Sequence, residues 1–337
     1  MEERGIYEAE FLDGLAPFVL EELVELGATS IKKKENSFRF RFGKSPEELY
    51  GLRTVVAVYR FLPYDISRPR ALLGDYNLRR LVEAITEVCS YSEFNSFRFN
   101  AAGKNSDVFR RLGHTLRSLT RLRFDPDGGG LVIRVRREKT NNGWEVLLRL
   151  SPRPLSARSW RVCNFRGGLN ATVAVAVNSM LGISSNDRYL NAMSGSGTIL
   201  IERALAGSWT SLVGCDRDSL ALDCARQNIK AAGLKGLDIL EADATALPVP
   251  EGSFDVVSAD LPWGDAVGSF NSLMELYPAF LTEMRRVISP GGRIALISHD
   301  LKRFEAFLRT QTGWQAKRQL QVFHGGHNPK VYLLQRA

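Results

Sequence analysis

Several protein classes are excluded by patterns that the sequence lacks. No apolar run of about 18 residues, the length that a membrane-spanning helix needs, occurs in the 337-residue chain. The four cysteines and four histidines show no Cys-x-x-Cys, His-x-His or His-Glu-x-x-His spacing, which argues against a zinc site and a disulfide framework. The acidic start of the chain has no apolar signal segment. We therefore expect a cytoplasmic protein with four reduced cysteines, no metal and no membrane contact.

Acidic and basic residues are unevenly distributed along the chain. Residues 1–50 carry 7 Lys and Arg against 11 Asp and Glu, residues 51–170 carry 22 against 10, and residues 171–337 carry 16 of each. Clusters of positive charge bind polyanions by displacing counterions. The middle of the chain is therefore predicted to bind nucleic acid, while the charge-balanced C-terminal half has a different task. A solvated basic face without a partner is the alternative interpretation.

The C-terminal half shows strands that alternate with helices. The expected elements are strands at 187–193, 210–216, 237–243, 254–260 and 293–298 and helices at 198–207, 219–233, 273–292 and 301–311. This alternation predicts a parallel sheet covered by helices on both faces. Two last strands, 315–323 and 330–337, are separated by His-Gly-Gly-His-Asn-Pro and must pair as a hairpin, with an antiparallel strand at the sheet edge. Such a finish is typical of class I methyltransferases and differs from the plain dinucleotide-binding sheet.

The N-terminal half mixes shorter elements. Helices are expected at 11–27, 75–88 and 107–123, hairpins at 30–42 and 131–151, and a strand at 96–103. These elements predict two small α+β units, residues 1–65 and 66–152. A linker, residues 153–185, leads into a C-terminal domain of residues 186–337.

A glycine-containing turn follows the first strand of the C-terminal half. In Asn-Ala-Met-Ser-Gly-Ser-Gly-Thr (191–198), Gly195 and Gly197 let the backbone approach a ligand, and the helix that follows favours negative charge at its start. A dinucleotide fingerprint would need a third glycine where Leu200 stands. The turn alone is also compatible with a ligand-free loop.

Three aspartates follow three further strands of the same half. Asp216 comes 21 residues after Gly195, and Asp243 and Asp260 end the next two strands. The carboxyl ends of parallel strands meet at one edge of a sheet, where open α/β sheets bind ligands. Asp216 could accept hydrogen bonds from ribose hydroxyls, and Asp243 could reach an adenine amino group. The series predicts a nucleoside-containing cofactor.

The stretch Asp260-Leu261-Pro262-Trp263-Gly264 ends the fourth strand with a residue that cannot continue a sheet ladder. It predicts a stiff loop that offers a carboxylate, a carbonyl and an aromatic face to a flat ligand. A strand-terminating turn with a buried tryptophan is the alternative for this stretch taken alone.

The four stretches "NAMSGSGT", "VGCD", "EADATALP" and "DLPWG", in this order, resemble motifs I to IV of S-adenosylmethionine-dependent amino-methyltransferases. Together with "LSPRPLSARSWRVCNFRGGLNATVA", they resemble the THUMP-domain RNA guanine-N2 methyltransferases, and more narrowly the TrmN branch, which methylates guanosine 6 of the tRNA acceptor stem. The resemblance covers the whole chain in element order. Leu261 departs from the commonest motif IV, which has proline there.

The resemblance implies a class I, Rossmann-like methyltransferase domain (186–337) after a ferredoxin-like domain (1–65) and a THUMP RNA-binding domain (66–152). It implies S-adenosylmethionine as cofactor, S-adenosylhomocysteine as product, no metal, and tRNA held by its acceptor stem and 3′ end, with no obligate protein partner. The cofactor-binding residues so implied are Asn170, Thr172, Asn191, Ser194, Gly195, Ser196, Gly197, Asp216, Arg217, Asp243 and Ala244. Asn170 is equally suited to cap a helix and Thr172 to be an ordinary first-turn residue.

The catalytic loop is assigned on chemical grounds as well. The guanine N2 amine is a poor nucleophile because its lone pair is delocalised into the ring. Acceptors aimed at its two N–H groups, the Asp260 carboxylate and the Leu261 carbonyl, would favour a pyramidal nitrogen. Trp263 would stack on the base and Pro262 would stiffen the loop. In-line displacement by the amine at the sulfonium methyl group would then depend mainly on how the two reactants are positioned. Either Asp260 or bulk water could take the proton.

Arginines are concentrated in and after the helix predicted at 107–123. The residues predicted to contact RNA are Arg110, Arg111, Arg117, Arg121, Arg158, Arg161 and Arg166, with Arg123, Arg134, Arg136 and Arg137 nearby. Five of these arginines, Arg110, Arg111, Arg117, Arg121 and Arg123, are expected to share this helix, whereas Arg158, Arg161 and Arg166 lie in the predicted linker. Duplex RNA is recognised through phosphates and shape, which arginines suit.

Three other functions remain open from the sequence. The same chemistry could act on tRNA guanosine 10 or on 23S rRNA. A dinucleotide-dependent oxidoreductase is disfavoured by Leu200 and by the terminal hairpin. An RNA-binding protein with an inactive methyltransferase fold is disfavoured by the intact glycines and aspartates.

Overall fold

The computed structural model describes residues 5–138, 142–262, 270–323, 326 and 328–337. Its contacts divide the chain into two compact units. The first comprises residues 1–11 and 19–156, and the second comprises residues 12–18 and 157–337. Among the described residues, no helix is long and apolar enough to cross a membrane.

The second unit is built on a seven-stranded sheet in the order β11-β10-β9-β12-β13-β15-β14. The strands are β9 (Arg188–Ala192), β10 (Ser211–Asp216), β11 (Asp238–Glu241), β12 (Phe254–Asp260), β13 (Ile288–Ser298), β14 (Trp314–Gln321) and β15 (Lys330–Arg336). The first five run parallel, and β15 is antiparallel to both β13 and β14. The predicted parallel sheet and terminal hairpin are confirmed. The antiparallel strand, however, lies inside the sheet: β15 inserts beside β13 and leaves β14 at the edge.

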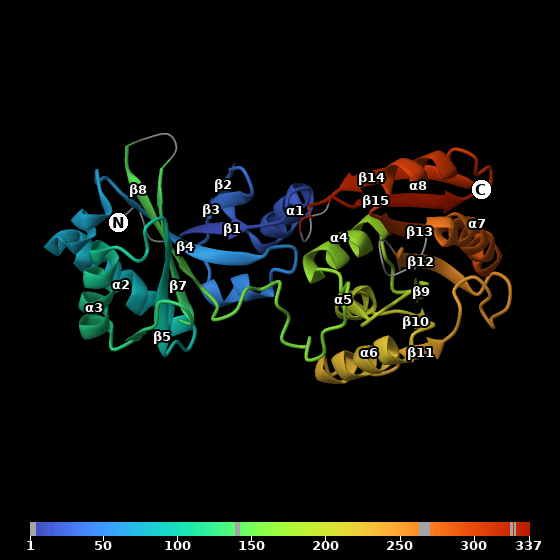
Figure 1. The fold of residues 1–337 in the computed structure, drawn as a ribbon, viewed down its shortest axis with the longest axis horizontal. Helices are drawn as coiled ribbons and strands as arrows, with labels where there is room; N and C mark the ends of the chain where they lie inside the picture. Colours follow the sequence, from blue (N-terminus) through green and yellow to red (C-terminus); the bar gives the residue numbers. More distant parts are fainter. Residues whose placement is uncertain (1–4, 139–141, 263–269, 324–325, 327) are drawn as a thin grey trace. The chain divides into compact units, whose positions relative to one another are not determined.

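Helices cover both faces of this sheet (Figure 1). They are α4 (Ala171–Leu181), α5 (Thr198–Leu205), α6 (Ser219–Ala231), α7 (Phe270–Val287) and α8 (Leu301–Leu308). Successive residues of a strand point to opposite faces. Leu190 and Ala192 of β9 therefore pack in the core formed with α7 and α8, while the Tyr189 hydroxyl donates to the Asn178 side chain of α4, 2.6 Å away. Helix α4, which was assigned to a linker, belongs to this unit by its contacts.

The first unit contains an eight-stranded sheet in the order β2-β3-β1-β4-β8-β7-β5-β6. The strands are β1 (Ile6–Glu10), β2 (Thr29–Lys33), β3 (Ser37–Arg41), β4 (Ala57–Tyr64), β5 (Ser96–Ala101), β6 (Arg123–Phe124), β7 (Leu131–Arg137) and β8 (Trp144–Arg149), and the helices are α1 (Ala16–Leu26), η1 (Pro46–Gly51), η2 (Pro69–Leu73), α2 (Asp75–Tyr91) and α3 (Asp107–Thr120). Both predicted hairpins form, β2–β3 and β7–β8. Because β4 pairs with β8, one sheet runs across the boundary predicted after residue 65.

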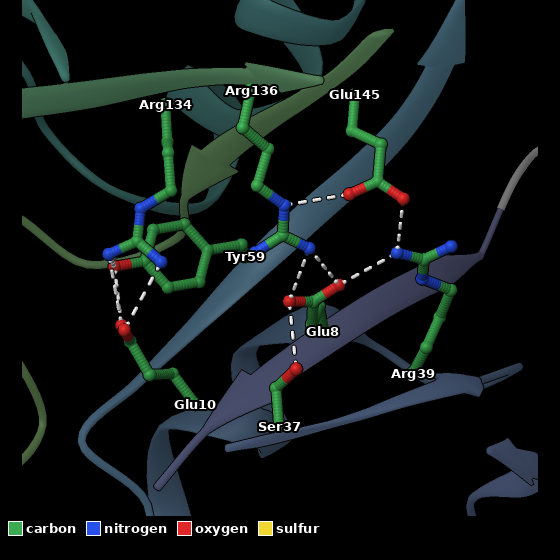
Figure 2. A network of polar contacts seen from close by, with 8 residues as sticks. All are labelled: Glu8, Glu10, Ser37, Arg39, Tyr59, Arg134, Arg136 and Glu145. Carbon is green, nitrogen blue, oxygen red and sulfur yellow. Dashed lines mark hydrogen bonds and ion pairs between the residues drawn. The ribbon is translucent and has the colours of Figure 1, made fainter. Parts of the chain in front are cut away.

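A network of ion pairs connects strands of this sheet (Figure 2). Glu8 of β1 accepts hydrogen bonds from Ser37, Arg39 and Arg136, at 2.8 to 3.0 Å. Glu145 of β8 accepts from the same two arginines at 2.7 Å. Glu8 and Glu145 are almost fully buried. Burial by itself would raise the pKa of Glu8, but the charge and hydrogen bonds of Arg136 and Arg39 lower it.

The basic helix ends earlier than the sequence predicts. Helix α3 stops at Thr120, and Arg121 takes a left-handed conformation with φ of 62°. Arg123 then belongs to β6, which pairs with β5. The expectation that five arginines share one helix is therefore wrong for these two residues, since the turn at Arg121 redirects the chain into the sheet.

The expectation of four reduced cysteines is wrong for two of them. A disulfide joins Cys163 to Cys224 of α6, whose Cα atoms are 5.4 Å apart. The two residues are 61 positions apart in the chain, so their spacing carried no signal. Cys89 and Cys215 are free thiols.

Candidate active site

The glycine turn connects β9 to α5 and is held from β10. Gly195 and Gly197 have φ of 52° and 80°, a left-handed backbone that other residues rarely adopt. The Gly195 N–H donates to the Asp216 carboxylate at 2.8 Å, and the other oxygen of Asp216 accepts from the Asp218 N–H at 3.0 Å. Asp216 therefore fixes the turn, in addition to the cofactor contact predicted for it.

Leu200, which stands where a dinucleotide fingerprint has glycine, has a packing role. The Leu200 side chain is fully buried. A Cβ atom added at Gly214 of β10 would lie 2.7 Å from Leu200 Cδ2. Gly214 thus makes room for Leu200. In the dinucleotide fingerprint a glycine on the helix lets helix and strand approach closely, whereas here the small residue is Gly214 on β10.

A pocket lies beside this turn at the carboxyl ends of β9 and β12. Its walls come from the segment before α4, from the turn, from the start of α5 and from the end of β12. The lining residues are Phe165, Arg166, Gly167, Gly168, Leu169, Asn191, Met193, Ser194, Gly195, Ser196, Thr198, Ile199 and Asp260. The structure thus brings together the predicted turn residues and Asp260, as expected for the carboxyl edge of a parallel sheet.

Buried polar atoms without a partner gather in this pocket. Asn191 is 1 % exposed, and its amide nitrogen donates to the Ser258 carbonyl and hydroxyl oxygens, whereas its Oδ1 has no hydrogen bond among the described residues. Ser194 Oγ and Asp260 Oδ1 are also buried and have no hydrogen bond among the described residues. Because a buried polar atom without a hydrogen bond costs free energy, such a cluster indicates a site that a polar ligand completes.

Asp260 has an unusual proton affinity. Burial of its carboxyl group raises its pKa from 3.8 to about 7. Strand pairing places it next to Ile297 of β13, whose carbonyl oxygen accepts from the Leu261 N–H at 3.0 Å. Leu261 is buried and Pro262 is half-buried. Trp263, to which a stacking role was assigned, lies outside the described residues.

The remaining acidic residue of the series is exposed. Asp243 follows β11, and its Oδ1 accepts from the Thr245 N–H at 2.8 Å and from the Thr245 hydroxyl at 2.7 Å. These hydrogen bonds lower the pKa of Asp243, so it carries its charge. Ala244 beside it is buried and Arg217 after β10 is exposed. None of these three residues lines the pocket, and their cofactor contacts stay predictions.

Asn170 and Thr172 stand at the start of α4 and do not line the pocket. The Asn170 side chain caps the helix by accepting from the Thr172 N–H at 2.9 Å and from the Thr172 hydroxyl at 2.9 Å. Thr172 is fully buried. Asn170 therefore caps the helix, which is the alternative role given for it in the sequence analysis.

The residues that the sequence analysis missed are the ones directly before this cap. Phe165 and Leu169, with Gly167 and Gly168 between them, form one wall of the pocket. A Cβ atom added at Gly168 would lie 3.1 Å from the Phe165 carbonyl oxygen and 3.8 Å from Ser196 Oγ. The adjacent glycines in "FRGG" were the available signal, because paired glycines allow close backbone approach.

Two of the predicted RNA-contacting arginines are engaged inside the second unit. The Arg158 guanidinium pairs with the buried Glu202 carboxylate at 2.8 Å. Arg161 donates to the Leu169 carbonyl at 2.7 Å and to the Thr198 hydroxyl at 2.8 Å. The other five predicted arginines are exposed, namely Arg110, Arg111, Arg117, Arg121 and Arg166.

The described residues contain no group of three or more His, Cys, Asp or Glu side chains that could hold a metal ion.

Comparison with known proteins defines the class. The profile of the UPF0020 family, described as RMKL-like, methyltransferase domain, matches residues 158–330, which is half of the chain. The chain belongs to this methyltransferase family.

Individual relatives extend the similarity to the whole chain. The tRNA (guanine(6)-N2)-methyltransferase of Thermus thermophilus is 28% identical over 98% of this chain and 99% of its own length. The crystal structure of TrmN from the same organism superposes with a TM-score of 0.79 at 27% identity, covering 98% of this chain and 99% of that one. The Bos taurus tRNA (guanine(6)-N(2))-methyltransferase THUMP3 is 32% identical over 50% of this chain, which is 36% of its own length.

Proposed function

We propose that the protein transfers a methyl group from S-adenosylmethionine to the exocyclic N2 of a guanosine in tRNA. The observation that carries this proposal is that Asp260, which begins the Asp260-Leu261-Pro262 stretch at the end of β12, lines one pocket with the glycine turn. The name of the Thermus thermophilus relative, with its end-to-end similarity, points to guanosine 6 as the target. Guanosine 10 of tRNA and 23S rRNA are the alternative targets of the same chemistry.

The pocket residues fit the proposed cofactor. Asn191 Oδ1 and Ser194 Oγ are buried atoms that lack hydrogen bonds among the described residues, and each can accept one from an ammonium or hydroxyl group. The turn at Gly195 and Gly197 opens the backbone to the ligand, and Phe165 offers an apolar surface. When bound there, S-adenosylmethionine supplies an activated methyl group on a sulfonium sulfur.

The chain's own groups would orient the guanine amine. The Asp260 carboxylate and the Leu261 carbonyl accept hydrogen bonds from the two N2 hydrogens, which directs the nitrogen lone pair away from both acceptors. Pro262 restricts the loop, and Asp260 can hold the proton that the amine releases. Trp263 completes the proposal as the residue that stacks on the base. The target base must leave its stack, which costs a few kcal/mol.

RNA binding is proposed for the first unit. Residues 66–152 would form a THUMP domain, after a ferredoxin-like domain of residues 1–65, and the methyltransferase domain predicted at 186–337 would also include α4 and the pocket wall before it. The exposed Arg110, Arg111 and Arg117 of α3 would contact the acceptor stem and 3′ end through phosphates. These arginines support the proposal because α3 presents its charged side to solvent.

The first experiment is to incubate the protein with methyl-labelled S-adenosylmethionine and unmodified tRNA transcripts, digest the RNA and identify the labelled nucleoside. Label in N2-methylguanosine is expected. Its loss when guanosine 6 is replaced by adenosine would assign the target, whereas retention would favour guanosine 10. Label in rRNA only would change the substrate. Absence of label from every RNA would contradict the proposal and favour a binding protein.

A second experiment addresses the RNA surface. Replacing Arg110, Arg111 and Arg117 by glutamate should weaken tRNA binding and flatten its dependence on salt concentration, by about 0.7 to 0.9 in the logarithmic slope for each lost phosphate contact. Unchanged affinity at every salt concentration would show that α3 is only a solvated surface.

A further inference from the structure

One wall of the pocket is a segment without helix or strand. Residues 162–169, here called the wall segment, precede α4, and five of them line the pocket. Backbone of this kind has no ladder of hydrogen bonds to hold it. The Arg161 side chain donates to the Leu169 carbonyl at the end of the wall segment, at 2.7 Å, and the start of the segment is held from α6.

Asn228 of α6 makes four hydrogen bonds that hold the start of the wall segment. Its Oδ1 accepts from the Val162 N–H at 3.0 Å and from the Cys163 N–H at 2.9 Å. Its Nδ2 donates to the Cys163 carbonyl at 3.1 Å and to the Ser196 carbonyl at 3.2 Å. Asn228 is fully buried. One carboxamide thus connects the wall segment to the glycine turn.

The disulfide makes a second connection at the same place. Cys224 lies on α6 one turn before Asn228, and it is bonded to Cys163, whose backbone Asn228 holds. Residues four apart on a helix lie on the same face. Both connections therefore join the same point of the wall segment to the same face of α6.

We infer that Asn228 is a positioning residue for the cofactor pocket, and that its hydrogen bonds and the Cys163–Cys224 crosslink form a double latch on the wall segment. The inference rests on the proposed function, because it concerns the affinity for S-adenosylmethionine and its product. Either connection keeps the wall segment against the turn when the other is removed. Loss of both releases the start of the segment and weakens cofactor binding, because the ligand must then order it.

The test is a double-mutant cycle read by calorimetric titration with S-adenosylhomocysteine. The variants are Asn228→Ala, Cys163→Ser and the double variant. Gln227→Ala, which removes an exposed carboxamide from the preceding position of α6, and Cys89→Ser, which removes a free thiol from α2, are matched controls. Each single variant should weaken binding about threefold, and the double variant about thirtyfold, which exceeds the ninefold product of independent sites.

Hydrogen exchange of the ligand-free proteins supplies a readout apart from binding. The amides of residues 162–169 should exchange faster in the double variant, while those of β9 keep their protection. Faster exchange that extends to β9 would assign the loss to global destabilisation and overturn the inference. Affinities of the double variant within about twofold of the two controls would overturn it as well.

The design separates failure of the inference from failure of the proposed function. If the unaltered protein does not bind S-adenosylhomocysteine, the proposed cofactor is wrong and the inference about its affinity falls with it. If the unaltered protein binds and the double variant binds equally well, the cofactor stands and the latch alone is refuted.

Discussion

Polar groups are buried in both units, but they are buried in different ways. In the sheet of the first unit, the carboxylates Glu8 and Glu145 each accept hydrogen bonds from arginines (Figure 2). Of the buried side-chain polar atoms that the structure describes in this unit, only Arg39 Nε lacks a partner. In the pocket of the second unit, three buried polar atoms have no partner among the described residues. A compensated network stabilises the fold, whereas an uncompensated cluster marks a place that a ligand completes.

The two regions also differ in what a substitution should change. In the network, removal of one carboxylate leaves Arg39 and Arg136 with a single shared partner, so the free energy of unfolding should fall. In the pocket, removal of an unpartnered atom should change ligand binding and leave stability intact. The following predictions test this difference, from the largest expected effect to the smallest.

Asp260→Ala should reduce the rate of methyl transfer about 10²- to 10⁴-fold, because the amine then loses the acceptor that orients it. The measurement is single-turnover methylation of a tRNA transcript, with tRNA affinity measured in parallel. Asp260→Asn, which keeps an acceptor oxygen without the charge, is the control for shape. Turnover of Asp260→Ala equal to that of the unaltered protein would refute the catalytic role of this carboxylate.

Glu8→Ala should destabilise the first unit by about 3 kcal/mol, because Arg39 and Arg136 lose a buried partner. The free energy of unfolding is measured in urea, and binding of S-adenosylhomocysteine should stay unchanged. Glu93→Ala, an exposed glutamate of the same unit, is the control. A loss no greater than that of the control would show that the network is not a stabilising element.

Asn191→Ala should weaken binding of S-adenosylhomocysteine about tenfold, the effect of one lost hydrogen bond to a charged group. Asn191 Oδ1 has no partner among the described residues, so its removal should not lower the free energy of unfolding. Any loss of stability should come from the two hydrogen bonds that Asn191 Nδ2 donates to Ser258. A large loss of stability without a change in affinity would make this residue part of the fold and would break the comparison.

The pH dependence of methylation should report Asp260. Its carboxyl has a pKa of about 7 because of burial, so kcat/KM should rise about tenfold per pH unit below pH 7 and level off above it. The native state holds this proton more tightly than the unfolded state, so the same group lowers stability as pH rises from about 4 to 7. A pH profile that is identical in Asp260→Asn would assign the inflection to another group.

Much of the second unit could be predicted because its signals are local. Strand–helix alternation, Gly195 and Gly197, and aspartates at strand ends each reflect the conformation of a few consecutive residues, and the topology of a parallel sheet brings them together. The end of α3 was misplaced because Arg121 adopts a left-handed backbone conformation. Arginine rarely adopts it, so the residue type gives no signal that the helix ends there.

The sequence by itself determined the class of fold, the turn and the acidic edge of the pocket, since these depend on periodicity and on short motifs. Only the tertiary structure decided which residues close the pocket. Cys163 meets Cys224 across 61 positions and Asn228 across 65, and Glu8 meets Arg136 across 128. Such contacts have no local period, because they depend on how elements pack after each has formed.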